Sequence, residues 1–451
     1  MAWLSLAFVY GQGHRQRPIL LFLGLYAIIF VSYFVALRSL SRPLRRSAAL
    51  WLIIGFAILF RAALLWSHPI QEDDFYRYLW DGSVVAHGLN PYRFTPSEVQ
   101  KSKGENQTIE PYDRIGEEDA ALAVILARVN HPEVPTIYPP LAQAVFGLSA
   151  LLAPGSLLAL RLAFLSFDLG LCGLIVALLR HLEISPFYCL IYAWSPLVIK
   201  ETMNSVHYDV VPTFFLVLAL LLSLKQKVLL AHVSFAFAVL GKIYPLLLLP
   251  MFLWRTWQTR GHLHAFLGFG VALLVIAFGY APFHDAGASL WRGTLTFAGQ
   301  WQTNSLLFPF LRALVGERWI ANGIVILALS GVVAVVLARG ALQAGREFLW
   351  SVFLVLGALF LLSPVGNPWY FLWLVPFLCV FPLQSWLLLS GLLGLYYLSF
   401  YFSYHQAKET FRWVIWLEYA PFLVMLLWEW LTLRSLHGFT SPPESFLRPP
   451  V

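Results

Sequence analysis

Three consecutive carboxylates, Glu72, Asp73 and Asp74, follow directly after an apolar stretch that is long enough to cross a bilayer. That stretch covers roughly residues 48–66 and carries one charge, Arg61, near its far end. Acidic side chains are costly beside lipid, so a cluster of them at the mouth of a membrane helix indicates chemistry at the membrane–water boundary. A carboxylate held there could take a proton from an attacking hydroxyl group as a general base.

The composition sets the class of protein. The chain is 59% hydrophobic and 12% charged, whereas soluble domains carry about 25% charged residues. We therefore predict an all-α polytopic membrane protein. The three cysteines lie far apart in apolar stretches, which favours packing over metal or redox roles. The net charge of +7 is dispersed between apolar segments, which favours basic cytoplasmic loops over nucleic-acid binding.

Hydropathy and the positive-inside rule give a topology. The apolar segments lie near residues 18–37, 47–66, 157–179, 186–200, 210–224, 228–241, 243–254, 264–282, 318–338, 347–362, 371–383, 386–402 and 414–433. Two shorter stretches, 139–153 and 305–315, are interpreted as re-entrant or interfacial helices. Basic clusters then mark the cytoplasmic side, and the polar loops with the acidic run face outward.

Four regions follow from this topology: N-terminal transmembrane helices at 1–66, an extracytoplasmic loop at 67–138, a transmembrane core at 139–434 and a cytoplasmic tail at 435–451. The first half of the loop, 74–86, has apolar and aromatic residues at helical spacing, which predicts an amphipathic helix on the membrane surface. Residues 95–118 are polar and too poor in apolar side chains for a core of their own, so we expect a mobile stretch.

Other polar residues gather at the same predicted face. Lys242 lies between two apolar segments, where an unpaired cation is expensive and therefore indicates function, although it could also reach the interface by snorkelling. Glu201, His207 and Asp209 belong to an outer loop at helix ends, where either a site or an ordinary loop fits. The acidic run could equally cap the helix that follows it, and each outer tryptophan could belong to an aromatic belt.

Several segments resemble prokaryotic GT-C glycosyltransferases, which are integral membrane enzymes that use polyprenyl-phosphate sugars. DDFYRYLWDG at 73–82 and HGLNPYR at 87–93 look like the first outer loop of that family, and NHPEVPTIYPPL at 130–141 resembles its end. Weaker similarities are NSVHYD at 204–209, KIYP at 242–245 and NPWY at 367–370. The sequence departs from the family in the extra apolar segment at 18–37, which puts the N-terminal topology in doubt but leaves the loop in place.

The resemblance implies a GT-C fold with about 13 transmembrane helices plus re-entrant and juxtamembrane helices. It implies that a hexose, with mannose favoured, moves from a polyprenyl-phosphate donor to an acceptor hydroxyl, with inversion at the anomeric carbon. Asp74 is the expected base, and Asp73 shares or supports that role. The residues expected at the donor phosphate are Lys242, Arg77 and Tyr244. Those expected at the sugar or acceptor are Glu201, His207, Asp209, Trp301, Asn367, Trp369 and Tyr370.

We expect no obligatory cofactor and assign no metal ligand, although the acidic run leaves a divalent cation open. The chain has no glycine-rich phosphate loop, so a nucleotide sugar is disfavoured as donor. Expected partners are the lipid-linked donor, a lipid, glycan or protein acceptor, and membrane lipid, with no nucleic acid. The expected location is a bacterial inner membrane with an extracytoplasmic site. The alternatives are a glycan ligase or polymerase, and a flippase or transporter of lipid-linked sugar.

Overall fold

A computed structural model describes Leu4 and residues 17–38, 46–102, 109, 111–340 and 342–437. Over these residues the chain is helical and forms no strand, and one isolated parallel bridge joins Thr303 to Val365. The prediction of an all-α polytopic membrane protein is confirmed. α22 ends at His437, three residues into the proposed tail at 435–451, and the rest of that tail lies outside the described residues.

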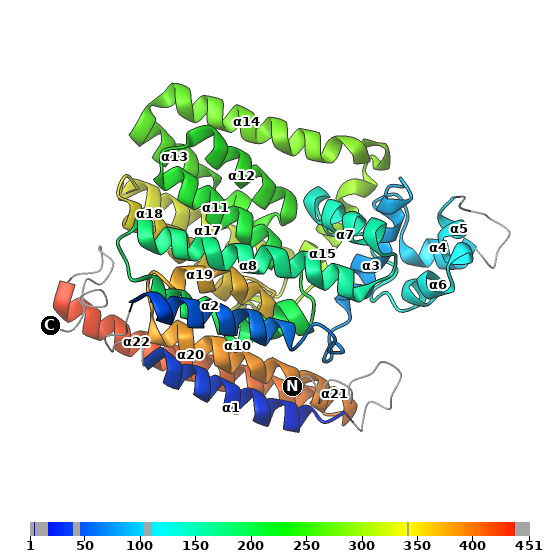
Figure 1. Ribbon diagram of the computed structural model, residues 1–451, viewed down its shortest axis with the longest axis horizontal. Helices are drawn as coiled ribbons and strands as arrows, with labels where there is room; N and C mark the ends of the chain where they lie inside the picture. Colours follow the sequence, from blue (N-terminus) through cyan, green and yellow to red (C-terminus); the bar gives the residue numbers. More distant parts are fainter. Residues whose placement is uncertain are drawn as a thin grey trace.

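Seven helical stretches in the described part of the chain are long and apolar enough to cross a membrane, and they run in roughly the same direction in Figure 1. They are α1 (Ile19–Arg38), α8 (Leu157–His181), α14 (His262–Tyr280) with η7 (Ala281–Ala286), α17 (Arg318–Ala338), α18 (Gly345–Leu362), the run α20 (Gln384–Leu392), η9 (Leu393–Tyr397) and α21 (Leu398–Tyr404), and η10 (Lys408–Thr410) with α22 (Phe411–His437). The shorter apolar helices are α2 (Arg46–Ala62), α7 (Pro140–Leu152), α11 (Val210–Leu224) and α12 (Val228–Gly241).

Four of the expected apolar segments are not single helices. The one near 386–402 is the run of α20, η9 and α21. The stretch near 186–200 divides into η4 (Pro186–Cys189), α9 (Leu190–Ala193) and α10 (Pro196–Ile199). The stretch near 371–383 contains η8 (Pro368–Trp373) and α19 (Val375–Leu378), and the one near 243–254 begins as η6 (Tyr244–Leu248) before α13 (Leu249–Arg260). In the three stretches just described, proline stands at the first or second position of η4, α10, η8, α19, η6 and α13, and it lacks the N–H group that a continuing helix needs. Irregular backbone of this kind is tolerated at membrane depth where protein covers it.

The two stretches interpreted as re-entrant are short helices. Residues 139–153 contain α7, which at 13 residues is about 20 Å long, and 305–315 contain the 8-residue α16 (Phe308–Val315). Both are shorter than the roughly 30 Å hydrocarbon core. Neither can therefore cross as a straight helix, in agreement with the expectation.

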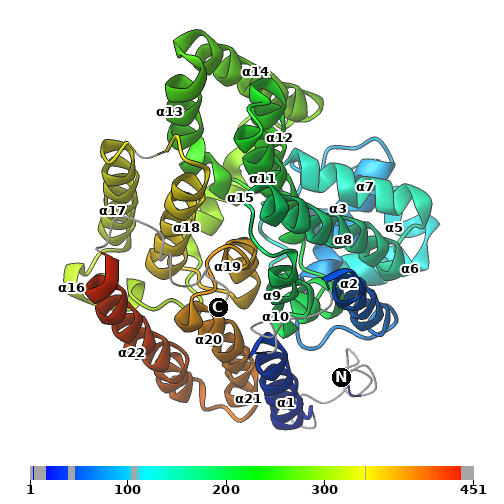
Figure 2. The same ribbon diagram turned by 60° about the vertical axis from the view of Figure 1, so that its left-hand side comes forward.

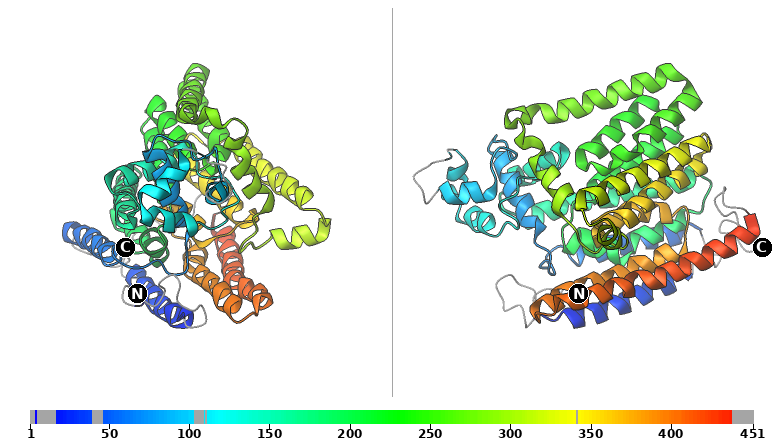
Figure 3. Two further views of the ribbon diagram at one scale, coloured as in Figure 1. Left: turned by 90° about the vertical axis from the view of Figure 1, so that its right-hand side faces the viewer. Right: turned by 180° about the vertical axis from the view of Figure 1, so that it is seen from behind.

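A compact group of helices stands beyond one end of the bundle, on the right of Figure 1 and on the left of the right panel of Figure 3, in blue and cyan. We call it the outer lobe. It contains α3 (Asp74–Ala86), α4 (Pro96–Ser102), α5 (Tyr112–Glu118) and α6 (Ala120–Ala127), with α7 packed against α3. The acidic run therefore stands where the bundle meets this lobe.

The helix expected over 74–86 is present as α3, but the prediction of an amphipathic helix with a solvated polar face is wrong. Ten consecutive residues, Phe75 to Val84, are buried. The approach to α7 is close, since a Cβ atom on Gly82 would lie 2.5 Å from the Phe146 carbonyl oxygen. A solvated polar face cannot be present on a helix that is covered all round, so α3 is a packed element that fixes Asp74 at its first position.

The expectation of a mobile, coreless stretch at 95–118 is also wrong for the residues that the structure describes there. Thr95 and Glu98 form a reciprocal capping box: the Thr95 backbone N–H donates to Glu98 Oε2 over 2.6 Å, and the Glu98 N–H donates to Thr95 Oγ1 over 3.1 Å. Val99 and Ile115 are both buried in the main hydrophobic cluster. This stretch gains its apolar partners from α3 and α6 and needs no core of its own.

A buried ion pair joins three separate elements inside the bundle. The Arg61 guanidinium on α2 lies 2.5 Å from Asp168 on α8, and neither side chain has any exposed surface. The same guanidinium donates to the carbonyl oxygen of Ala193 on α9 over 2.7 Å. The pairing and the hydrogen bonds compensate the loss of hydration, so the one charge in the apolar 48–66 stretch holds helices together.

Arg255 and Arg346 lie at the end of the bundle opposite the acidic run, whereas Arg77 and Lys242 lie beside that run. α11 begins directly after Asp209, near the acidic run, and extends about 22 Å to Leu224. A second cavity, of about 600 Å³, is lined at that far end by the termini of α8 and α11 together with Arg255 and Arg346. In Figure 2 the left-hand end of the bundle in Figure 1 is turned toward the viewer, with α8 and α11 seen obliquely. The far end therefore carries two arginines, with Glu183 and Glu347 beside them, and the acidic run stands at the other end.

Candidate active site

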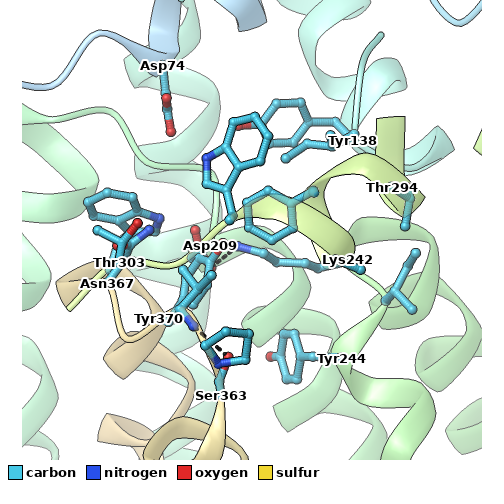
Figure 4. A pocket seen from close by; sticks show the side chains of 18 of the residues that line it. Asp74, Tyr138, Asp209, Lys242, Tyr244, Thr294, Thr303, Ser363, Asn367 and Tyr370 are labelled. Carbon is cyan, nitrogen blue, oxygen red and sulfur yellow. Dashed lines mark hydrogen bonds and ion pairs between the residues drawn. The ribbon is translucent and has the colours of Figure 1, made fainter. Parts of the chain in front are cut away.

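A cavity of about 640 Å³ lies between the outer lobe and the bundle. Ten of the twelve residues predicted for the site line it: Asp73, Asp74, Arg77, Asp209, Lys242, Tyr244, Trp301, Asn367, Trp369 and Tyr370. Figure 4 shows Asp74 on one side of this cavity and Lys242 reaching toward Asp209 on another. Glu201 and His207 do not line it. Segments separated by nearly 300 residues thus meet at one place, as the predictions require.

The acidic edge of the cavity is organised by Asn130. Its side-chain amide nitrogen donates to Asp73 Oδ1 over 2.9 Å and to Asp74 Oδ1 over 2.8 Å. Asp74 is the first residue of α3, where the helix dipole favours negative charge. One amide therefore holds both carboxylates in fixed positions at the cavity wall.

Burial changes the acidity of these groups. It raises the pKa of Asp73 to about 6, and the neighbouring charge of Asp74 adds to the rise. Burial also raises the pKa of Asp74, opposed by the Asn130 hydrogen bond and by the charge of Lys242. Burial raises the pKa of Glu72 well above its ordinary value, opposed by Lys200. A carboxylate tuned toward neutral pH is a better proton acceptor from a hydroxyl group than an ordinary one.

Lys242 follows the end of α12 and is already paired. Its Nζ lies 2.5 Å from Asp209 Oδ1 and 4.0 Å from the centre of the Tyr370 ring. The indole nitrogen of Trp373 donates to the same Asp209 oxygen over 2.7 Å. The ammonium group is thus held by one carboxylate and by the faces of aromatic rings, with part of its surface open to the cavity.

Three stacked rings form a platform beside this cation. Tyr244 stacks on Trp373 with ring centres 3.9 Å apart, and Tyr370 stacks on the same indole at 4.7 Å. Trp301 stands at another part of the wall, edge-on to His131 at 4.8 Å. Flat, rigid aromatic surfaces of this kind suit the apolar face of a sugar ring.

Arg77 lines the cavity, but its guanidinium is engaged with the outer lobe. One nitrogen donates to the carbonyl oxygens of His131 over 3.0 Å and of Asn130 over 3.3 Å. These bonds hold the segment that carries Asn130 against α3. The expected contact between Arg77 and a phosphate stays a prediction, and the contacts that the structure describes are with the backbone.

Glu201 and His207 lie behind the cavity wall. The His207 ring is stacked on the indole of Trp369, with centres 3.8 Å apart and planes 14° apart. Both side chains are fully buried. A direct contact with a sugar would require the indole to move, so their expected role at the sugar stays untested.

One wall of the cavity is apolar. It is built by α15 (Ser289–Gln300), α17 and α18, which contribute Phe297, Val325, Ile326, Leu329, Leu359 and Phe360. Ile326 is largely exposed on the outside of the bundle. A helical surface that is apolar and uncovered in a membrane protein faces lipid, so this wall adjoins the bilayer.

The predictions missed Asn130, Trp373 and Tyr396, all of which line the cavity. Asn130 opens the 130–141 segment, so the resemblance pointed to it. Trp373 stands three residues after Tyr370, and this helical spacing could have placed both rings on one face. Tyr396 is surrounded by apolar residues and gives no comparable signal.

In the part of the chain that the structure describes, no group of three or more His, Cys, Asp or Glu side chains is arranged to hold a metal ion. The side chains at the acidic edge that could coordinate a metal ion are Asp73 and Asp74, which the amide nitrogen of Asn130 bridges, and Glu72 beside them. Whether the reaction needs a divalent cation stays open, as does the expectation of no obligatory cofactor.

Comparison with known proteins gives one match. Residues 2–258, more than half of the chain, match the family of the α-(1→6)-mannopyranosyltransferase N-terminal domain. No curated protein and no solved structure matches the chain. The matched region contains the acidic run, Asn130, Asp209 and Lys242. A membrane-embedded helical bundle with a cavity of this composition agrees with that match, and the chain belongs to the α-(1→6)-mannopyranosyltransferase family.

Proposed function

We propose that the protein transfers mannose from a polyprenyl-phosphate mannose to a hydroxyl group of an acceptor at the extracytoplasmic face of a bacterial inner membrane. The family supports a membrane mannosyltransferase and therefore favours an enzyme over a flippase. The observation that carries the finer proposal is the composition of the cavity: carboxylates on one edge, a cation on aromatic rings on another, and an apolar wall toward lipid.

In the proposed reaction Asp74 takes the proton of the acceptor hydroxyl while its oxygen attacks the anomeric carbon. The bond from that carbon to the phosphate oxygen breaks, and its electron pair leaves with the polyprenyl phosphate. One displacement inverts the anomeric centre. Asp73 and Asn130 keep Asp74 in place, and the proximity of both reactants in one cavity lowers the barrier.

The departing phosphate gains negative charge, so it needs a cation or hydrogen-bond donors. Lys242 is suited to this because its ammonium group adjoins the cavity and can turn from Asp209 to the phosphate. The hydroxyl group of Tyr244 is a second donor nearby, and it has no hydrogen-bond partner among the described residues. The prenyl tail would lie against α17 and α18.

The proposed orientation rests on charge. Arg255 and Arg346 lie at the end of the bundle opposite the acidic edge, and basic residues mark the cytoplasmic side of membrane proteins. A cavity at the other end would meet lipid-linked donors rather than cytoplasmic nucleotide sugars. The family name favours the 6-hydroxyl of a mannoside as acceptor, and we propose that linkage for the product.

The test uses the full chain in nanodiscs with radiolabelled polyprenyl-phosphate mannose and octyl α-mannoside. We expect a disaccharide with a (1→6) linkage, and a loss of at least about 10²-fold in Asp74→Asn. Glu117→Gln is the matched control, because it removes one exposed carboxylate of the outer lobe that does not line the cavity. Full activity in Asp74→Asn, or transfer from GDP-mannose alone, would refute the proposal.

A further inference from the structure

His207 is a buried imidazole between two carboxylates. Its Nδ1 lies 4.0 Å from Asp74 Oδ2, and its Nε2 lies 3.5 Å from Glu201 Oε2. Neither ring nitrogen has a hydrogen-bond partner among the described residues. Catalytic hydrogen bonds are often long before substrate binds and tighten in the reacting complex. The ring is therefore placed to connect the proposed base with a group deeper in the protein.

The backbone forces this placement. Glu201 belongs to η5 (Lys200–Asn204), a single turn of π-helix, and the His207 backbone N–H donates to the Glu201 carbonyl oxygen over 2.9 Å. Val206 between them has a φ of +62°. A β-branched residue in the left-handed region is strained and persists only where its surroundings hold it. The segment is thus turned back so that both side chains face each other.

The two oxygens of Glu201 have different surroundings. Oε1 accepts a hydrogen bond from the Tyr397 hydroxyl over 3.0 Å and lies 3.4 Å from Lys200 Nζ. Oε2 has no hydrogen-bond partner in the described part of the chain, and it faces His207 Nε2. The contact between Oε2 and Nε2 needs one proton, which belongs either to the carboxyl group or to the ring.

The position of that proton decides what the ring presents to Asp74. If Nε2 carries it in a neutral ring, the lone pair of Nδ1 points at the Asp74 carboxylate and the two repel. If Oε2 carries it, the carboxyl group donates to Nε2, and the neutral ring has its own proton on Nδ1. The second arrangement satisfies both contacts, and the first satisfies one.

We propose that Glu201, protonated on Oε2, fixes the tautomer of His207, which then donates from Nδ1 to the ionised Asp74 and orients it. This inference rests on the proposed role of Asp74 as base. His207 is a positioning residue, and Trp369 keeps its ring in plane. Asp74 is then held on Oδ1 by Asn130 and on Oδ2 by His207, which leaves its remaining lone pairs for the acceptor hydroxyl.

The charges around the ring agree with a neutral imidazole. The groups that face it are Asp74 from α3, Glu201 and Lys200 from η5, Trp369 from η8 and Lys242 after α12. Burial, then the charges of the two lysines, lowers the pKa of His207 well below its ordinary value. Burial raises the pKa of Glu201, opposed by Lys200. Both directions favour the proposed protonation states at neutral pH.

Substitutions at Glu201 separate this role from proton transfer. In Glu201→Gln the amide oxygen can take the place beside Tyr397, and the amide N–H then donates to Nε2 as the carboxylic acid would. We expect kcat within about threefold of the unchanged protein, and a fall of about 10²-fold in Glu201→Leu. Equal losses in the two variants would overturn the inference. They would show that residue 201 must gain or lose a proton, which glutamine cannot do.

Substitutions at His207 test the donor to Asp74. The side-chain amide of His207→Asn can mimic Nδ1, whereas that of His207→Gln can mimic Nε2. We expect kcat to fall about 10²-fold in His207→Gln, with donor KM within about twofold, and to fall far less in His207→Asn. The acid limb of the pH profile should move to higher pH in His207→Gln, because a lost donor raises the pKa of a carboxyl group.

His232→Gln is the matched control, since this buried histidine lies on α12 away from the cavity and should leave the profile unchanged. Equal rates in the two His207 variants, or an unmoved acid limb, would overturn the inference. Wild-type protein that transfers no mannose would instead refute the proposed function, and the inference with it.

A direct measurement on the unmodified protein needs no activity, and a variant serves only to assign the signal. Nitrogen-15 NMR of labelled histidine in nanodiscs, with the His207→Asn spectrum used to assign the signal among the 12 histidines, reports which ring nitrogen carries the proton. We expect a protonated Nδ1 and an unprotonated Nε2 at neutral pH. The opposite tautomer, or a doubly protonated ring, would overturn the inference.

Discussion

Lys242 Nζ lies 2.5 Å from Asp209 Oδ1, so the cation proposed to meet the donor phosphate is compensated before any substrate arrives. The two residues are 33 positions apart. Asp209 precedes α11, and Lys242 follows α12. Trp373 donates to the same carboxylate oxygen. Asp209 can therefore keep a polar partner when Lys242 turns toward the phosphate, which limits the cost of breaking the ion pair.

The first prediction concerns this lysine. Lys242→Met keeps much of the side-chain volume and removes the charge. We expect donor KM to rise about tenfold or more while acceptor KM changes by less than about twofold, because only the donor carries a phosphate. Steady-state kinetics with each substrate varied in turn provide the measurement. Lys225→Met, at the far end of α11, is the matched control. Equal effects on both substrates would remove Lys242 from the phosphate site.

The second prediction concerns pH. The pKa of Asp73 is raised to about 6, and Asn130 joins it to Asp74. We therefore expect transfer to increase as pH rises through about 6, since the coupled pair must lose a proton before Asp74 can accept one. Asp73→Asn removes a neighbouring negative charge, so the acid limb should move to lower pH. The measurement is kcat between pH 4.5 and 8. A limb that moves upward would contradict the proposed pairing.

The third prediction concerns orientation. The three native cysteines are buried, so we expect only an introduced cysteine to react with a labelling reagent. Glu133→Cys, exposed beside the acidic edge, should react with a membrane-impermeant maleimide in intact cells. Gln343→Cys, exposed at the second cavity, should react only after the membrane is opened. The reverse pattern would place the cavity in the cytoplasm and refute the proposed donor.

The fourth prediction concerns the contact between α3 and α7. Gly82→Ala introduces a Cβ atom 2.5 Å from the Phe146 carbonyl oxygen. This oxygen belongs to the backbone of α7, which cannot move away easily. We expect a loss of about 1–3 kcal/mol in unfolding free energy, measured in detergent by thermal or denaturant unfolding. Gly173→Ala on α8 is the control, because nothing lies within 4 Å of its added Cβ atom. Equal stability of the two variants would show that α3 can shift.

The sequence was sufficient to predict the helical class and to select residues from distant segments that meet in one cavity. Asp74, Asp209 and Lys242 were identifiable because charged residues at the ends of apolar helices are costly and seldom without a role. Their mutual geometry was not predictable. That Lys242 pairs with Asp209, or that Asn130 bridges two aspartates, depends on how α3 and α12 pack, and single-sequence patterns carry no such information.

The errors have physical causes that differ from place to place. Residues 95–118 seemed coreless because their own apolar side chains are few, yet Val99 and Ile115 use partners from neighbouring helices. The capping box at Thr95 was a local signal for order that the low hydropathy obscured. α3 has polar and aromatic residues at helical spacing, and burial of its polar side chains depends on partners such as Gln143 on α7, which donates to Asp81 over 3.3 Å.

The buried pair of Arg61 and Asp168 has a consequence for biosynthesis. The two residues are 107 positions apart, and at about 5–20 residues per second the aspartate is made roughly 5–20 s after the arginine. During that interval α2 carries an uncompensated guanidinium in its last turn, where the cost of insertion is below the value of about 2.5–3.5 kcal/mol that applies at a helix centre. Pairing with Asp168 should remove this cost. We therefore expect α2 and α8 to leave the insertion channel together.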